Sequence, residues 1–212
     1  MSAAEMERHA LCDLFEDLGP GAPTLNEGWL TEHLAVHLYV REHRPDALPG
    51  LVMGPAHRWT AHLERRAKER LAYGDVVRRL RQGAPPWSVF GLPGVGDRTG
   101  LHEWFVHHED VRRANGMGPR DDSPAQQRLD DAVWKILPVW GPLLAHRVAA
   151  HVTLVADDGR RRRVRPKGPT VEVHGRPSEI LLELFGRRGV AVTEAIGEEE
   201  GLARWRAGPL GL

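Results

Sequence analysis

LHEWFVHHED, at residues 101–110, is the stretch that decides how the rest of this chain is interpreted. Glu103 and His107 stand four residues apart in it, and on an α-helix such positions lie one turn apart on the same face. A carboxylate and an imidazole arranged in this way can bind one metal ion together. A third ligand from a facing helix would complete a site of two histidines and one carboxylate with open coordination positions, which is typical of catalytic metal centres.

The upstream segment LAVHL, at residues 34–38, supplies a candidate for the third ligand. A helix is predicted over residues 29–43, and His37 falls within its core-facing sector. Two simpler interpretations stay open from the residues alone. The acidic and histidine side chains of 101–110 could form an ordinary solvated helix face, and His37 could be a core histidine bonded to a carbonyl or hydroxyl group.

Other histidines compete for the same role, because the chain has twelve of them. His33 and His37 also stand four residues apart and could form a two-histidine pair. His33, however, lies beside an acidic residue at the exposed edge of the predicted helix, which favours a surface position. His43, His102 and His108 are further substitutes, so spacing alone leaves the identity of each ligand open.

Composition bounds the class of protein. The chain has 212 residues, 41% of them apolar, and no apolar run approaches the roughly 18 residues that a membrane span needs. Its 29 basic and 29 acidic residues balance, so we expect no nucleic-acid partner. The single cysteine, Cys12, excludes an internal disulfide framework and is expected to be a small buried residue. The acidic N-terminus is unlike a signal peptide, and we expect a cytoplasmic protein.

Periodicity predicts helices first and strands later. The predicted helices cover residues 4–18, 29–43, 55–81, 99–114 and 124–149, and prolines 138 and 142 predict a kink or break in the last of these. The later elements are a β-hairpin of strands 152–156 and 161–165, a strand at 170–174, a helix at 178–185, a strand at 190–196 and a helix at 198–205. This order predicts a helical bundle over residues 1–148 and a small α+β domain over residues 149–212.

Three segments resemble a known family. EGWLTEHLAVHL, at residues 27–38, resembles the tryptophan-led second helix of the mycothiol-dependent maleylpyruvate isomerase family, one of the DinB-like four-helix bundles, where this helix carries the first metal-binding histidine. HEWFVHHEDV, at residues 102–111, is similar to that family's E-x-x-x-H-x-x-D helix. VEVHGRPSEILLELFGR, at residues 171–187, resembles the small sterol-carrier-like domain that follows. The whole-chain pattern is most similar to an actinobacterial subgroup described only as metal-binding.

The resemblance implies a mainly α fold, with a DinB-like four-helix bundle followed by a small α+β, sterol-carrier-like domain. It places a divalent metal on His37, Glu103 and His107. By ligand type the metal is zinc, with iron or nickel as alternatives. The implied activity is that of a transferase or isomerase that uses a low-molecular-weight thiol such as mycothiol on a small electrophile. The alternative is a non-catalytic module that binds a metal or a small ligand.

Four further side chains are candidates for supporting roles. Asp110, one turn beyond His107, could orient a ligand imidazole or could simply pair with a nearby arginine. Arg41, Arg112 and Arg113 could bind carboxylates of a thiol cofactor or of an acidic substrate. We expect a small-molecule substrate and a monomer or homodimer.

Overall fold

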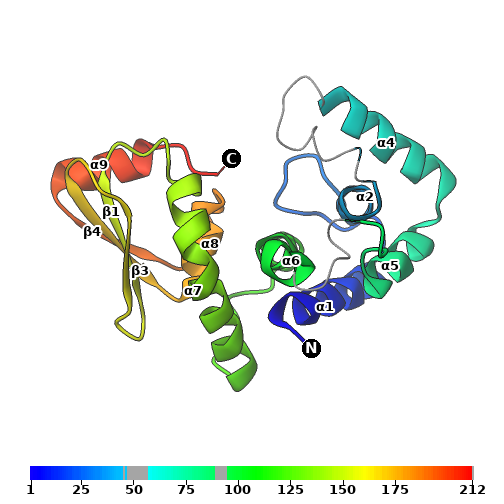
Figure 1. Ribbon diagram of the computed structural model, residues 1–212, viewed down its shortest axis with the longest axis horizontal. Helices are drawn as coiled ribbons and strands as arrows, with labels where there is room; N and C mark the ends of the chain where they lie inside the picture. The colour runs from blue at the N-terminus through cyan, green and yellow to red at the C-terminus, as the bar shows by residue number, and fades with distance from the viewer. Residues whose placement is uncertain (45, 47–56, 89–94, 212) are drawn as a thin grey trace. The chain divides into compact units, whose positions relative to one another are not determined.

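The protein is described here by a computed structural model, which covers residues 1–44, 46, 57–88 and 95–211 (Figure 1). The chain divides into two compact units, Met1–Gly118 and Pro119–Leu212. The first unit is helical, and the second combines helices with a small sheet. This order confirms the fold class predicted from the sequence. Within the described ranges, no helix has both the length and the apolar character needed to span a membrane.

Helices build the first unit. They are α1 (Ala3–Leu18), α2 (Thr31–His43), α4 (His57–Arg70), α5 (Tyr73–Gln82) and α6 (Val95–Ala114). Helix α1 packs along α6 and against α5, and α2 packs against α4 and α5. Ser2 begins α1 with a capping box, in which its hydroxyl accepts a hydrogen bond from the Glu5 amide and the Glu5 carboxylate accepts one from the Ser2 amide.

The core of this unit contains charged side chains as well as apolar ones. Leu11 and Phe15 of α1 and Trp104 of α6 are buried in it. Beside them Arg8 forms an ion pair with the buried Glu42, and its guanidinium lies 4.6 Å from the centroid of the Trp104 ring. Burial of such a pair costs solvation that its mutual attraction must offset.

The helix predicted over residues 55–81 is two helices. Helix α4 ends at Arg70 and α5 begins at Tyr73, with Ala72 in an extended conformation between them. The Tyr73 hydroxyl donates a hydrogen bond of 2.9 Å to the carbonyl of Phe15 near the end of α1. This tertiary contact anchors the start of α5, and no proline or glycine precedes Tyr73 to signal the break. Residues 55 and 56 lie outside the described part of the chain.

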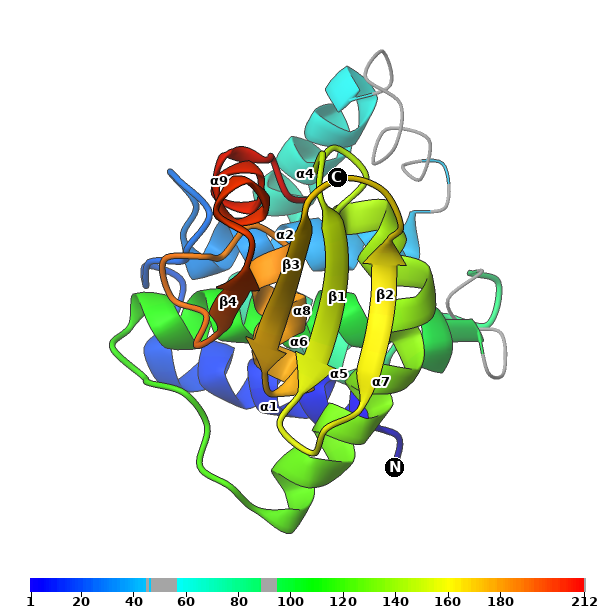
Figure 2. The same ribbon diagram turned by 90° about the vertical axis from the view of Figure 1, so that its left-hand side faces the viewer.

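A mixed sheet forms the second unit together with three helices. The elements are α7 (Pro124–Leu144), β1 (His151–Ala156), β2 (Arg161–Arg165), β3 (Thr170–Gly175), α8 (Pro177–Leu184), β4 (Glu194–Gly197) and α9 (Glu199–Ala207). The strand order is β2-β1-β3-β4, in which β1 pairs antiparallel with β2 and parallel with β3, and β3 pairs antiparallel with β4. Figure 2 shows α7 and α8 behind one face of this sheet. Gly159, with φ of 85°, supplies the left-handed conformation in the turn of the predicted hairpin.

The structure divides the chain between Gly118 and Pro119, whereas the sequence put the division at residue 148. Helix α7, which the sequence predicts to belong to the bundle, packs against α8 and β2 instead. Its Trp134 ring lies under the guanidinium groups of Arg160 and Arg162, at 5.3 and 5.2 Å. At Gly141 a Cβ atom would come within 2.6 Å of a Val164 methyl carbon, so glycine permits the close approach of helix and strand.

Two local predictions in this unit need correction. Helix α7 ends at Leu144 instead of residue 149, and it continues through Pro138 and Pro142, so of the predicted kink or break the break does not occur. The strand predicted over residues 190–196 is shorter, because the amides of Val190 and Ala191 both bond to the carbonyl of Arg187 and form a turn. The strand that remains, β4, begins only at Glu194.

Candidate metal centre

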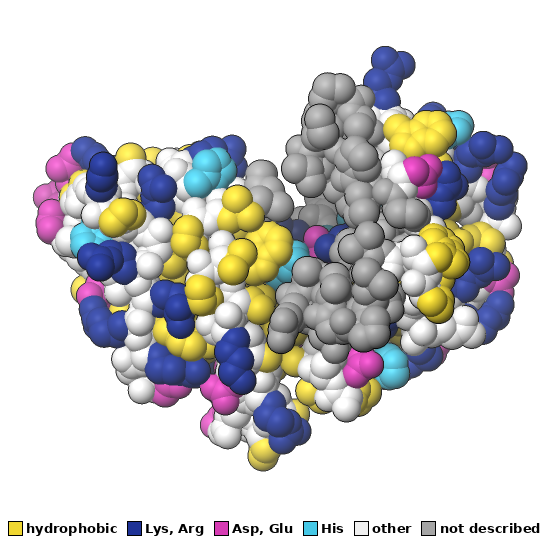
Figure 3. All heavy atoms as spheres, in the orientation of Figure 1, with side chains coloured by type: hydrophobic (Ala, Val, Ile, Leu, Met, Phe, Trp, Pro, Cys, Tyr) yellow, Lys and Arg dark blue, Asp and Glu magenta, His cyan; other side chains and the backbone are white. Residues whose placement is uncertain are grey.

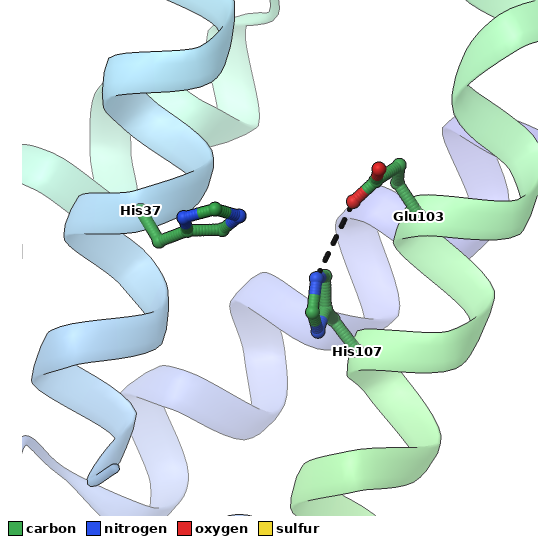
Figure 4. Close-up of side chains that lie close together, drawn as sticks. All are labelled: His37, Glu103 and His107. Atoms are coloured by element: carbon green, nitrogen blue, oxygen red, sulfur yellow. Dashed lines mark ion pairs between the residues drawn. The ribbon is translucent and has the colours of Figure 1, made fainter. Parts of the chain in front are cut away.

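The structure brings together the three predicted ligands. Figure 4 shows His37 pointing from α2 toward Glu103 and His107, which lie one turn apart on α6. One ligand atom from each of the three lies within 4.8 Å of the others. The Nε2 atom of His107 is 3.3 Å from the Glu103 carboxylate, and the two imidazole centroids are 5.8 Å apart. All three side chains are partly buried, so the cluster is shielded from water but still accessible.

A carboxylate lies behind each imidazole. His37 Nδ1 is 2.9 Å from an oxygen of Glu64 on α4, and His107 Nδ1 is 3.0 Å from an oxygen of Asp110. When each Nδ1 carries the proton and donates it to its carboxylate, the Nε2 lone pair of each ring is free to bind a metal. Asp110 is fully buried, and Asn26 donates a hydrogen bond of 3.2 Å to the same carboxylate oxygen.

Glu103 is held from its other side. Its Oε1 atom is 3.3 Å from the guanidinium of Arg41 and 3.6 Å from Nε2 of His102. Burial alone would raise the pKa of Glu103, but the positive charge of Arg41, together with hydrogen bonds from His102 and His107, holds the pKa well below its usual range. The carboxylate is therefore ionised at neutral pH, with Oε1 facing Arg41 and His102 and Oε2 facing His107.

The His107 imidazole has the opposite balance. Burial lowers its pKa, but hydrogen bonds to Asp110 and Glu103 and the negative charge of both carboxylates outweigh burial and raise the pKa to about 9. Without a metal this ring carries a proton on each nitrogen at neutral pH. A metal that binds Nε2 has to displace one of them.

The donor set fits a divalent metal. Zinc binds imidazole nitrogen and carboxylate oxygen at about 2.0–2.2 Å, which places neighbouring ligands of a tetrahedral site roughly 3.4 Å apart. The distance of 3.3 Å between His107 Nε2 and Glu103 Oε2 already matches this spacing. The ligand atom of His37 lies within 4.8 Å of the other two. Two neutral imidazoles and one carboxylate would leave the remaining coordination positions open.

The other predicted site residues have different neighbours. Arg41 contacts Glu103, as described. Arg112 and Arg113 both form ion pairs with the buried Glu109, at 2.8 and 2.7 Å. Three of the competing histidines have other partners: His33 accepts a hydrogen bond from the Leu30 amide, His43 contacts the Tyr39 carbonyl, and His108 contacts Glu7. The fourth, His102, lies beside the site, with Nε2 3.6 Å from Glu103.

Two contacts to His37 escaped the sequence analysis. Glu64 lies in a helix rich in arginine and glutamate, and no spacing singles it out from Glu69 five residues later. The Trp29 ring meets the His37 ring edge to face, with centroids 5.3 Å apart. Trp29 was noticed only through the family resemblance, and its contact with the imidazole follows from the fold.

Among the comparisons with known proteins, the one with solved structures identifies the fold. No protein-family model matches the sequence, and no curated protein matches it either. Two solved structures match, both of mycothiol-dependent maleylpyruvate isomerase. The chain has the fold of that isomerase. One match, a histidine-to-alanine mutant, has a TM-score of 0.54 and 14% identity, and the other has a TM-score of 0.53 and 16% identity.

Each match covers 94% of this chain and 91% of the isomerase chain, so it spans the helical unit and the α+β unit in the same order. This agreement confirms the family resemblance at the level of the fold. At 14% and 16% identity, this likeness shows the fold alone. The similarity to an actinobacterial subgroup stays a prediction.

Proposed function

We propose that the protein binds one divalent metal ion through His37, Glu103 and His107 and uses it in a thiol-dependent isomerisation or transfer reaction on a small electrophile. The observation that carries the proposal is the convergence of three ligand atoms within 4.8 Å, with a carboxylate behind each imidazole. The thiol part rests on the fold shared with an isomerase that depends on mycothiol. Zinc is the metal that best suits the ligand types, with iron or nickel as alternatives.

The residues of the chain have separable tasks in this proposal. Glu64 and Asp110 each accept the Nδ1 proton of an imidazole and so direct the Nε2 lone pairs of His37 and His107 inward. Arg41 holds one oxygen of Glu103, so that the carboxylate offers a single oxygen as a ligand. When bound, a divalent metal lowers the pKa of an incoming thiol and makes it a nucleophile at neutral pH. Partial burial of the three ligands limits the access of competing water.

A cobalt-substituted sample tests the thiol step. We expect Co²⁺ to bind in place of the native metal and its visible absorption bands to shift when mycothiol is added, because a sulfur ligand changes the ligand field. The S-methyl derivative of mycothiol is the matched control and should leave the bands unchanged. Bands that stay unmoved by saturating mycothiol would refute thiol activation while leaving the metal site intact.

A second candidate function is a non-catalytic module that binds a metal or a small ligand. It is favoured by one observation, namely that Glu103 already has three partners in Arg41, His102 and His107. Such a network satisfies the charges of the cluster without a reaction. Stoichiometric metal binding combined with cobalt bands that no thiol changes would support this second function over the first.

The carboxylate of Glu64 provides a prediction about positioning. Glu64→Ala should weaken zinc affinity by about 10- to 100-fold, the usual cost of removing the partner behind a ligand histidine. Glu64→Gln, which keeps a hydrogen-bond acceptor near Nδ1, should recover part of that affinity. Competition with a chromophoric chelator measures the affinity. Glu69→Ala removes an exposed glutamate from the same helix and should change nothing; equal affinities for both alanine variants would show that Glu64 has no such role.

A further inference from the structure

A groove between α2 and α4 lies apart from the metal centre and has a different chemistry. Its cavity of about 220 Å³ is smaller than a pocket for a drug-sized ligand. The floor is apolar and the rim carries guanidinium groups and a phenol. The lining residues are Tyr39, Val40, Arg44, Leu63, Arg66, Ala67, Arg70 and Leu71. Figure 3 shows lysine and arginine side chains gathered over α4 on this part of the helical unit.

The rim is strongly positive because two of its arginines lack counter-charges. Arg44 is neutralised by Asp46, with two hydrogen bonds of 2.9 and 2.8 Å. Arg66 and Arg70 form no ion pair with any residue that the structure describes, although Glu69 is close to both in sequence. Other arginines of this unit do pair with carboxylates; Arg8, Arg41, Arg78, Arg81, Arg112 and Arg113 are examples.

The spacing of Arg66 and Arg70 suits one shared anion. They stand four residues apart on α4, so their Cβ atoms are about 6 Å apart on one helix face and the two like charges destabilise the helix. An oxyanion bound between two guanidinium groups relieves that repulsion and accepts several hydrogen bonds in a planar fork geometry.

Groups next to the groove support the same charge preference. Arg79 on α5 lies with its guanidinium 3.4 Å from the Tyr39 hydroxyl oxygen and 6.0 Å from the centroid of the ring. It adds a positive charge beside the rim and donates one hydrogen bond to the Tyr39 oxygen, which leaves the hydroxyl hydrogen able to donate. Below the rim, Val40 and Leu63 are almost fully buried and form an apolar floor.

We propose that this groove binds a small organic anion, in which a phosphate or carboxylate group lies between Arg66 and Arg70 and an apolar body lies against Val40 and Leu63. The size of the cavity limits the apolar body to about one ring. The site shares no residue with the metal centre, so the two can be tested separately.

Calorimetric titration with phenyl phosphate, benzoate and inorganic phosphate tests the proposal on the full-length protein. Phenyl phosphate or benzoate should bind saturably, with a dissociation constant near or below about 1 mM, and the stronger of the two identifies the preferred anionic group. Inorganic phosphate should bind more weakly, because it lacks an apolar body. Added sodium chloride should weaken all three by screening.

Variants decide whether binding occurs in this groove. Arg66→Ala with Arg70→Ala should weaken binding by at least about tenfold, because two charge-assisted contacts are lost. Arg65→Ala removes an exposed arginine of the same helix that does not line the groove, and it should bind like the wild type. Metal content and helical circular dichroism should be unchanged in all variants. Absence of saturable binding, or equal binding by the double variant, would overturn the proposal; phosphate binding as tightly as phenyl phosphate would overturn the role of the apolar floor.

Discussion

Replacement of His107 with alanine is expected to abolish stoichiometric metal binding. The variant keeps His37 and Glu103, but the Nε2 atom that lies 3.3 Å from the carboxylate is gone. Loss of a partner behind a ligand costs up to about 100-fold in affinity, so loss of a ligand itself should cost more than roughly 100-fold. Glu103 would then remain as the ion-pair partner of Arg41. A metal held by two side chains should not survive dialysis against a weak chelator.

Elemental analysis of the dialysed protein measures this loss directly. His33→Ala is the matched control, because His33 lies one turn from His37 on the same helix and caps it through the Leu30 amide. We expect this control to retain its metal. If the His107 variant kept a full complement of metal, another set of side chains would have to bind it. The assignment of all three ligands would then be wrong.

The candidate ligands could be found from sequence because each half of the site is local. Glu103 and His107 are four residues apart, so helix geometry alone puts them on one face. The placement of His37 on α2 beside this pair on α6 is a tertiary contact between residues far apart in the sequence. From the residues alone His37 is one of several candidates, and the family resemblance selects it. The close approach of the His37 and His107 rings supports that selection.

The partners behind the ligands could not be found in the same way. Glu64 reaches His37 from a different helix, and its spacing in sequence resembles that of any surface glutamate. Arg41 falls one turn beyond His37 and is predicted to bind a carboxylate of a thiol cofactor or of an acidic substrate, but its guanidinium contacts Glu103. A pattern of residue types indicates which groups can form ion pairs, whereas the choice of partner depends on the rotamers that packing allows.

Helix α7 shows a similar limit at the level of the fold. Its apolar stripe predicts that one face is buried, and this is so for Val133, Trp134 and Leu137. The stripe does not specify which surface covers it. Short connections favour packing against the preceding helices, but the sheet formed by later residues provides the surface that α7 covers. The boundary predicted at residue 148 therefore lies after this helix instead of before it.

The buried carboxyl of Glu42 is expected to make the helical unit less stable as the pH rises from about 4.5 to 7. Glu42 is 2% exposed, and one of its oxygens has no hydrogen-bond partner among the described residues. Burial raises the pKa of Glu42 to about 7, although the positive charges of Arg8 and Arg41 oppose this increase. A carboxyl whose pKa is higher in the folded state stabilises the fold fully below the pKa of the unfolded chain. That contribution, on the order of 3 kcal/mol, is lost as the pH rises through the folded pKa.

Urea unfolding of metal-free wild type and Glu42→Gln at several pH values between 4.5 and 8 tests this expectation. The amide has nearly the shape of a protonated carboxyl and does not titrate, so the difference between the two proteins isolates Glu42 from the other groups. Between pH 4.5 and 8, we expect the free energy of unfolding of the variant, measured relative to that of the wild type, to increase by about 3 kcal/mol, in proportion to the shift of the pKa. If the Arg8 guanidinium instead keeps the carboxyl ionised below pH 5, the free energy of unfolding of the wild type will increase relative to that of the variant as the pH rises. The sign of that difference therefore separates a desolvated acid from a stable buried ion pair.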